Sequence, residues 1–176
     1  MRTIPLPCLV DTNVAVVANG RSDQADDALI EKCIDAILEV TGQGGLVLDA
    51  GGLIFEEYRD NLSLSGQPGT GDAFLKWVHD HQWNVELCER RSITCLDEDE
   101  QVFAEFPPAE ALKEFDRSDR KFVAVANAAE PKRPILQAVD FKWWGWKDTL
   151  ADVGIEVVFL DEAAAESGYR KHIGDE

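Results

Sequence analysis

The stretch Cys8-Leu9-Val10-Asp11-Thr12-Asn13 decides the expected fold, because a short apolar run stops abruptly at a carboxylate. Two prolines precede the run, and a run of this length with such boundaries is typical of a strand buried in a parallel sheet. Parallel α/β sheets bind ligands just beyond the carboxyl ends of their strands. Asp11 is therefore a candidate for chemistry, with Thr12 and Asn13 as polar neighbours. For a single isolated Asp, a cap on the following turn is the favoured interpretation, so a functional role for Asp11 depends on further acids later in the chain.

Strand and helix patterns alternate along the rest of the chain. The further predicted strands are Leu46–Asp49, Ile135–Asp140 and Ile155–Leu160. The first predicted helix starts at Ser22 or Asp23 and is ended by Gly42, Gly44 and Gly45. The further predicted helices cover about 53–64, 72–82, 107–115, 116–129 and 144–152. Short β-like pieces in 85–96 are not assigned to the sheet. The alternation predicts an α/β protein with three layers, a central parallel sheet flanked by helices.

Length and composition predict one domain over residues 1–176. A chain of 176 residues with 45% hydrophobic content can bury a substantial core, which we expect at about 8–160, with 161–176 as a polar tail that forms a surface helix. No apolar run approaches the roughly 20 residues that span a bilayer, and no secretory signal is visible. Four separated cysteines without a CxxC pair suggest reduced thiols, so we expect a cytoplasmic protein without membrane contact.

The formal net charge of −17 argues against a general nucleic-acid binder, since polyanions are repelled. The charge is uneven, however. Between Arg117 and Lys147 there are seven basic and only three acidic residues. The protein is thus acidic with one basic stretch.

The candidate chemistry lies in carboxylates that the topology brings together. Asp11, Asp49 and Asp140 each end a predicted strand, and Asp116 and Asp119 are three residues apart on one side of a predicted helix. Carboxylates that meet at one sheet edge repel one another, which raises some of their pKa values or requires a cation. Hard oxygen ligands suit Mg²⁺ or Mn²⁺. For Asp119 alone, a favourable interaction with the helix dipole is an equal alternative.

A zinc site is a weaker alternative. His79, His81, Cys88 and Cys95 could be imagined as its ligands, but their spacing fits no standard zinc ribbon or finger. His81 is better explained as a residue at the edge of the core.

The order of these motifs resembles the PIN-domain nucleases over about Leu9 to Leu160. The shared features are a strand that ends in Asp-Thr-Asn, an acid before Tyr58, an Asp that opens a Phe-Val-Ala-Val-Ala helix, and an Asp that closes the next strand. The resemblance implies catalytic and metal-binding roles for Asp11, Glu57, Asp119 and Asp140. Asp116 and Asp49 could supplement a ligand, and Thr12 and Asn13 would steer the carboxylates or a metal-bound water.

The same resemblance implies a Mg²⁺- or Mn²⁺-dependent endoribonuclease that cleaves single-stranded RNA. Many family members are toxins paired with an antitoxin, so a cognate inhibitor protein is an expected partner. This chain is longer than the small toxins, with extra residues around Glu86–Glu105, and it is more acidic. A homodimer is a further possibility that the sequence does not decide.

The segment from Phe141 to Lys147 interleaves aromatic residues with lysines, a pattern that suits a single nucleic-acid strand. The alternative is that its tryptophans pack a helix onto the sheet, and for at least one of them we expect packing. The candidate RNA-binding residues are Arg120, Lys121, Lys142, Trp143 and Lys147.

Two other functions compete with the nuclease. A dehalogenase-like phosphatase would need a second Asp where the chain has Asn13. A non-catalytic module that binds RNA or a protein partner stays open, because a fold does not determine activity.

Overall fold

A short parallel sheet forms the centre of the computed structural model, which describes residues 3–174. The strands of this sheet are β1 (Leu9–Val10), β2 (Leu46–Asp49), β3 (Cys88–Arg91), β6 (Ile135–Gln137) and β7 (Val157–Phe159). β1 pairs with β6, β6 with β7 and β2 with β3, all in parallel. A parallel bridge between Cys8 and Leu46 joins the two groups, so the strands follow the order β3-β2-β1-β6-β7.

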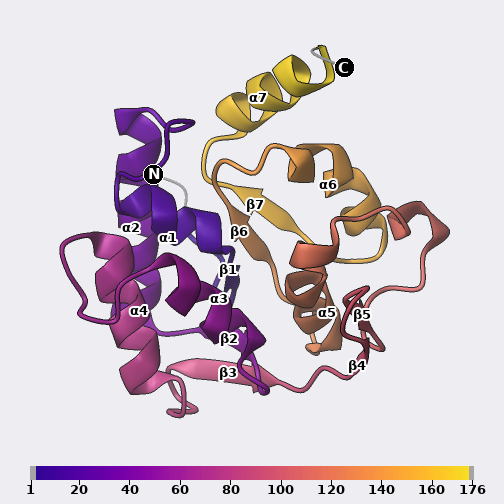
Figure 1. The fold of residues 1–176 in the computed structure, drawn as a ribbon, viewed down its shortest axis with the longest axis horizontal. Coiled ribbons are helices and arrows are strands. Elements are labelled where there is room, and N and C mark those ends of the chain that lie inside the picture. The colour runs from indigo at the N-terminus through magenta and orange to yellow at the C-terminus, as the bar shows by residue number, and fades with distance from the viewer. Residues whose placement is uncertain (1–2, 175–176) are drawn as a thin grey trace.

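Both faces of this sheet are covered. All residues of β1, β2 and β6 are buried, as expected of a parallel sheet inside an α/β protein. The helices are α1 (Thr12–Ala18), α2 (Asp27–Gln43), α3 (Leu53–Asn61), α4 (Thr70–His81), α5 (Arg120–Ala128), α6 (Lys142–Asp152) and α7 (Glu162–Gly174). In Figure 1, α1 to α4 gather on one side of the sheet, and α5 and α6 lie on the other. The predicted α/β class is confirmed.

Helix α1 is an element that the sequence reasoning missed. Asp11 directly caps it, since its side chain accepts a hydrogen bond from the backbone N–H of Asn13. The chain therefore turns from β1 into a helix without a loop. The predicted start of the next helix is also wrong: α2 begins at Asp27, because Asp26 accepts a hydrogen bond from the N–H of Leu29 at 2.8 Å. The residue that caps α2 is therefore Asp26, and not Ser22 or Asp23 as predicted.

The segment 86–119 differs most from prediction. It contributes the edge strand β3 and a small antiparallel hairpin of β4 (Cys95–Asp97) and β5 (Val102–Phe103), which contacts α5. The helix predicted over 107–115 reduces to one 3-10 turn, η1 (Glu110–Leu112), and a second turn, η2 (Arg117–Asp119), precedes α5. The extra residues thus extend the sheet and cover the side of α5.

The C-terminal segment forms the predicted helix, but α7 packs closely on the domain. A Cβ added to Gly168 would lie 2.3 Å from the Phe141 ring, and one added to Gly145 would lie 2.7 Å from the Tyr169 hydroxyl. Asp161 accepts a hydrogen bond from the N–H of Ala164 and pairs with Lys32 of α2. Residues 175 and 176 of the predicted tail lie outside the described part. Within that part, no helix combines the length and apolarity that a membrane crossing requires.

Candidate active site

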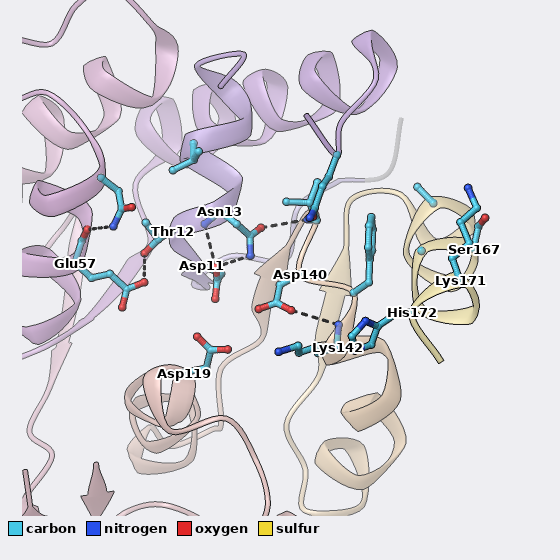
Figure 2. A pocket seen from close by; sticks show the side chains of 17 residues that line it. Asp11, Thr12, Asn13, Glu57, Asp119, Asp140, Lys142, Ser167, Lys171 and His172 are labelled. Carbon is cyan, nitrogen blue, oxygen red and sulfur yellow. Dashed lines mark hydrogen bonds between the residues drawn. The ribbon is translucent and has the colours of Figure 1, made fainter. Parts of the chain in front are cut away.

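A cleft of about 930 Å³ opens beyond the carboxyl ends of β1 and β6. Asp11, Glu57, Asp119 and Asp140 all line it, although they come from four separate parts of the chain. Figure 2 shows their carboxylates around a common space. The structure therefore brings together the four acids that the motifs singled out.

Asp11 lies at the deepest position, with 4% of its surface exposed. One of its oxygens accepts hydrogen bonds from the backbone N–H and the side-chain amide of Asn13, at 3.0 and 2.6 Å. Burial, followed by repulsion from Asp119, raises the pKa of Asp11 well above its ordinary value. The Asn13 hydrogen bonds offset only part of this cost.

Asn13 fixes the distance between two neighbouring strand ends. Its amide N–H₂ also donates to the Gln137 side chain at 2.7 Å, and its carbonyl oxygen accepts from the N–H of Ala138 at 3.0 Å. The residue thus ties the end of β1 to the end of β6. Because Asp140 follows β6 by three residues, this tie holds the Asp11 and Asp140 segments side by side.

Glu57 reaches the cleft because its neighbour Tyr58 anchors α3. The buried Tyr58 hydroxyl donates to the backbone carbonyl of Val10 in β1. Glu57 then accepts a hydrogen bond from the Thr12 hydroxyl at 2.6 Å. Its second oxygen pairs with the Lys121 ammonium of α5. The adjacency of an acid and a tyrosine in α3 thus has a geometric basis: one residue anchors and the other points into the cleft.

Asp119 and Asp140 form the opposite wall. Burial, followed by repulsion from Asp140 and Asp116, raises the pKa of Asp119 to about 7. The indole N–H of Trp143 donates to Asp119 at 3.1 Å and holds that carboxylate in place. Burial also raises the pKa of Asp140. The prediction that Asp140 ends its strand is wrong, since β6 stops at Gln137 and the acid lies in the following turn.

The two supplementary acids differ in position. Asp116 caps η2, accepting hydrogen bonds from the N–H and hydroxyl of Ser118 at 2.9 and 2.8 Å. It lies with Asp119 in a smaller hollow of about 160 Å³. Asp49, in contrast to the prediction, does not line the cleft. Both its oxygens accept hydrogen bonds from N–H groups at the start of α3, those of Leu53 and Ile54, at 2.8 Å each.

Most of the candidate RNA-binding residues do not lie in the cleft. Lys121 is only 8% exposed and is engaged by Glu57, and Trp143 is 1% exposed in the core, so neither is free to touch a strand. Arg120 donates to the backbone carbonyls of Phe115 and two other residues. Lys147 lies 4.6 Å over the Trp144 ring, away from the cleft. Of the five, only Lys142 lines the cleft.

Sequence reasoning missed a further wall of the cleft. Lys171, His172 and Ser167 of α7 line it, together with Phe141 and Lys142. Figure 2 shows these α7 residues across from the acids. The only signal in the sequence is a Lys-His pair in a segment that the pattern predicts to be a peripheral tail.

The carboxylate oxygens of these acids are suitable ligands for a hard cation such as Mg²⁺. Within residues 3–174, no group of three or more His, Cys, Asp or Glu side chains is arranged to hold a metal by itself. Mg²⁺ does not require such a cage, because it commonly binds through one or two carboxylates, several waters and substrate phosphates. Asp11, Asp119 and Asp140 repel one another as anions and fit such a partial set.

Comparison with known protein families, curated proteins and solved structures gives no match. Any functional assignment therefore depends on the residues of the cleft itself.

Proposed function

We propose that this chain is a Mg²⁺- or Mn²⁺-dependent endoribonuclease that hydrolyses phosphodiester bonds in single-stranded RNA, on a PIN-like three-layer fold. The observation that carries the proposal is the convergence of four carboxylates from distant segments in one cleft, with raised pKa values for Asp11, Asp119 and Asp140. Single-stranded RNA as the substrate follows from the resemblance of the motifs to PIN-domain nucleases. A cognate antitoxin and a homodimer are further predictions of that resemblance.

The arrangement of charges favours a cation site over a purely structural acid cluster. Lys121 already compensates Glu57, and within residues 3–174 no lysine, arginine or histidine forms an ion pair as close as this with Asp11, Asp119 or Asp140. Crowded anions of this kind are costly unless a cation or a proton is shared among them. Perturbed carboxyl pKa values in a cleft are a recognised feature of functional sites.

Asp11, Asp119 and Asp140 would hold the metal, with Glu57 beside them. A bound divalent ion lowers the pKa of its water and neutralises charge on a phosphate. The contribution of the protein is to hold the carboxylates in fixed positions. Thr12 and Lys121 fix both oxygens of Glu57, and the Trp143 indole fixes Asp119. A side-chain nucleophile is not needed in this scheme.

The proposal is tested by incubating the purified protein with labelled single-stranded RNA in Mg²⁺ or Mn²⁺, and in EDTA. Cleavage that requires the metal is expected. In parallel, Mg²⁺ should raise the melting temperature, because a ligand that binds only the folded state at 100 times its Kd adds about 2.7 kcal/mol. Cleavage that persists in EDTA would exclude the mechanism, and a melting temperature unaffected by either metal would argue against the site.

A phosphatase control separates the competing chemistry. The wild type should hydrolyse the diester bis(p-nitrophenyl) phosphate and leave the monoester p-nitrophenyl phosphate intact. Preferential hydrolysis of the monoester would favour the phosphatase alternative.

A further inference from the structure

The cleft continues well beyond its acids. It extends along α7, where Lys171 and His172 line it, and Figure 2 shows Lys142 and His172 near Asp140, with Lys171 farther along the helix. A volume of about 930 Å³ lies near the upper end of the roughly 300–1,000 Å³ typical of small-ligand sites. The cleft therefore has room for more than a single phosphate group at the carboxylates.

Helix α7 is seated as a fixed wall. Gly168 allows the backbone of α7 to approach the Phe141 ring, and Gly145 of α6 allows the approach of Tyr169. Any side chain at Gly168 would force the ring or the helix to move, since an added Cβ would lie 2.3 Å from the ring. The Asp161–Lys32 pair fixes the start of the helix. The position of Lys171 and His172 thus follows from several independent contacts.

Basic side chains line the cleft beside its acids. Lys171 and His172 lie along α7, and Lys142 lies next to the carboxylates of Asp116, Asp119 and Asp140, in a protein with a net charge of −17. Lys142 and His172 both lie near Asp140, and the backbone N–H of Lys142 donates a hydrogen bond to that carboxylate at 3.3 Å. Cations at this place would attract a polyanion into a cleft whose carboxylates otherwise repel it.

We propose that the basic side chains of α7, Lys171 and His172, bind the substrate at a second phosphate, the one that flanks the phosphate at the carboxylates. The inference rests on the proposed function for the identity of the substrate as a polynucleotide. It implies that α7 is part of the substrate-binding surface and that the enzyme holds an extended strand across the cleft. The best substrate is then an internal bond with a nucleotide phosphate on the α7 side.

The test measures binding of a short fluorescein-labelled single-stranded RNA by anisotropy, over a series of KCl concentrations. The Asp11→Asn protein serves as the background, so that the probe stays intact. Adding Lys171→Gln and His172→Gln should weaken binding at least about fivefold and reduce the salt slope by about 0.7 for each phosphate that the protein no longer neutralises. Arg170→Gln is the matched control, because Arg170 is on the same helix but pairs with Glu166 and does not line the cleft.

A second variant tests the wall without changing charge. Gly168→Val should displace α7 from Phe141 and weaken RNA binding to a similar extent, while circular dichroism verifies that the domain stays folded. An unchanged dissociation constant and salt slope in the Lys171/His172 variant would overturn the proposal. An equal weakening in Arg170→Gln would also overturn it, since the effect would then be one of overall charge.

Failure of the proposed function can be recognised separately. Hydrolysis of bis(p-nitrophenyl) phosphate by the wild type with Mn²⁺ tests the carboxylates with a substrate that has no flanking phosphate. If that hydrolysis occurs while the substitutions in α7 leave the RNA affinity unchanged, only the further inference fails. If neither diester nor RNA is hydrolysed, the nuclease proposal fails, and the RNA-binding series still decides the role of α7.

Discussion

Asp11 and Asp72 are both almost fully buried, with 4% and 1% of their surface exposed, yet their environments are opposite. Asp72, in the first turn of α4, accepts hydrogen bonds from the N–H groups of Ser63 and Gly69, the Asn19 amide and the Arg21 guanidinium. Burial acts to raise the pKa of Asp72, but these donors outweigh it and lower that pKa. At Asp11, burial and the neighbouring acids prevail and the pKa rises.

The comparison shows that burial alone does not indicate the role of a carboxylate. Asp72 is surrounded by donors that its own fold supplies, and it closes the loop between α3 and α4. Asp11 has Asn13 as its donor and faces three other acids in the cleft. A buried acid whose partners are complete stabilises the structure, whereas one left facing like charges is available to bind a cation.

The largest expected effect concerns Asp11. Asp11→Asn should lower RNA cleavage by roughly a thousandfold, about 4 kcal/mol in the activation free energy, because an amide is nearly isosteric but a poor metal ligand. The variant should be no less stable than the wild type, since the change removes a repelled charge. Cleavage kinetics and urea denaturation measure the two quantities. A folded variant with wild-type activity would contradict the role of Asp11.

Asp72 should show the reverse pattern. Asp72→Asn weakens a charged acceptor of several buried donors, and we expect a decrease of about 3 kcal/mol in the free energy of unfolding. Cleavage by the folded fraction should stay near that of the wild type. Urea denaturation followed by tryptophan fluorescence gives the stability. An Asp72→Asn protein that is as stable as the wild type but inactive would show that Asp72 does not differ from Asp11 in its role.

Glu57 and Glu56 provide a narrower comparison on one helix. Glu57 lines the cleft and contacts Thr12 and Lys121, while Glu56 is exposed. Glu57→Gln should reduce cleavage about a hundredfold, or about 2.7 kcal/mol, and weaken Mn²⁺ binding. Glu56→Gln should be close to neutral in both measurements. If Glu56→Gln were the more damaging change, the placement of α3 would have to be wrong.

The smallest expected effect is a difference in pH dependence, measured in EDTA. The pKa of Asp119 is raised from 3.8 to about 7, so between these values the folded protein keeps a proton that the unfolded chain has released. Its contribution to stability is therefore greatest below pH 4, falls as the pH rises to about 7, and is level above that. Asp119→Asn removes this decline and should be more stable than the wild type near pH 7.5 by of order 1–2 kcal/mol.

The stability contribution of Asp72 has the opposite sign. Because its folded pKa is lowered, the contribution is present above the ordinary value of 3.8 and is lost as the pH falls further. Urea denaturation at several pH values separates the two. A difference between Asp119→Asn and the wild type that does not grow from about pH 4.5 to 7.5 would show that Asp119 is not repelled in the folded protein.

The sequence by itself determined the elements whose signals are local. Apolar runs that end at turns marked β1, β2, β6 and β7, because a strand buried on both faces is built mainly from apolar residues. Helical periodicity indicated most of the helices. These strand and helix signals depend on neighbours within a few positions, so they are readable without tertiary contacts. The four acids of the cleft were singled out in another way, by the resemblance of their motifs to those of PIN-domain nucleases.

Tertiary structure decided which similar-looking residues do different things. Asp11 and Asp49 both end a buried run, yet Asp49 is satisfied by the N–H groups of α3 while Asp11 faces the cleft. Lys121 and Trp143 matched an RNA-binding pattern, but long-range contacts with Glu57 and Asp119 hold them inside. The place of α7 beside the acids likewise depends on contacts between residues far apart in the chain. The physical reason is that the charge and availability of a side chain are determined by the groups that packing brings around it, and the local sequence does not contain that information.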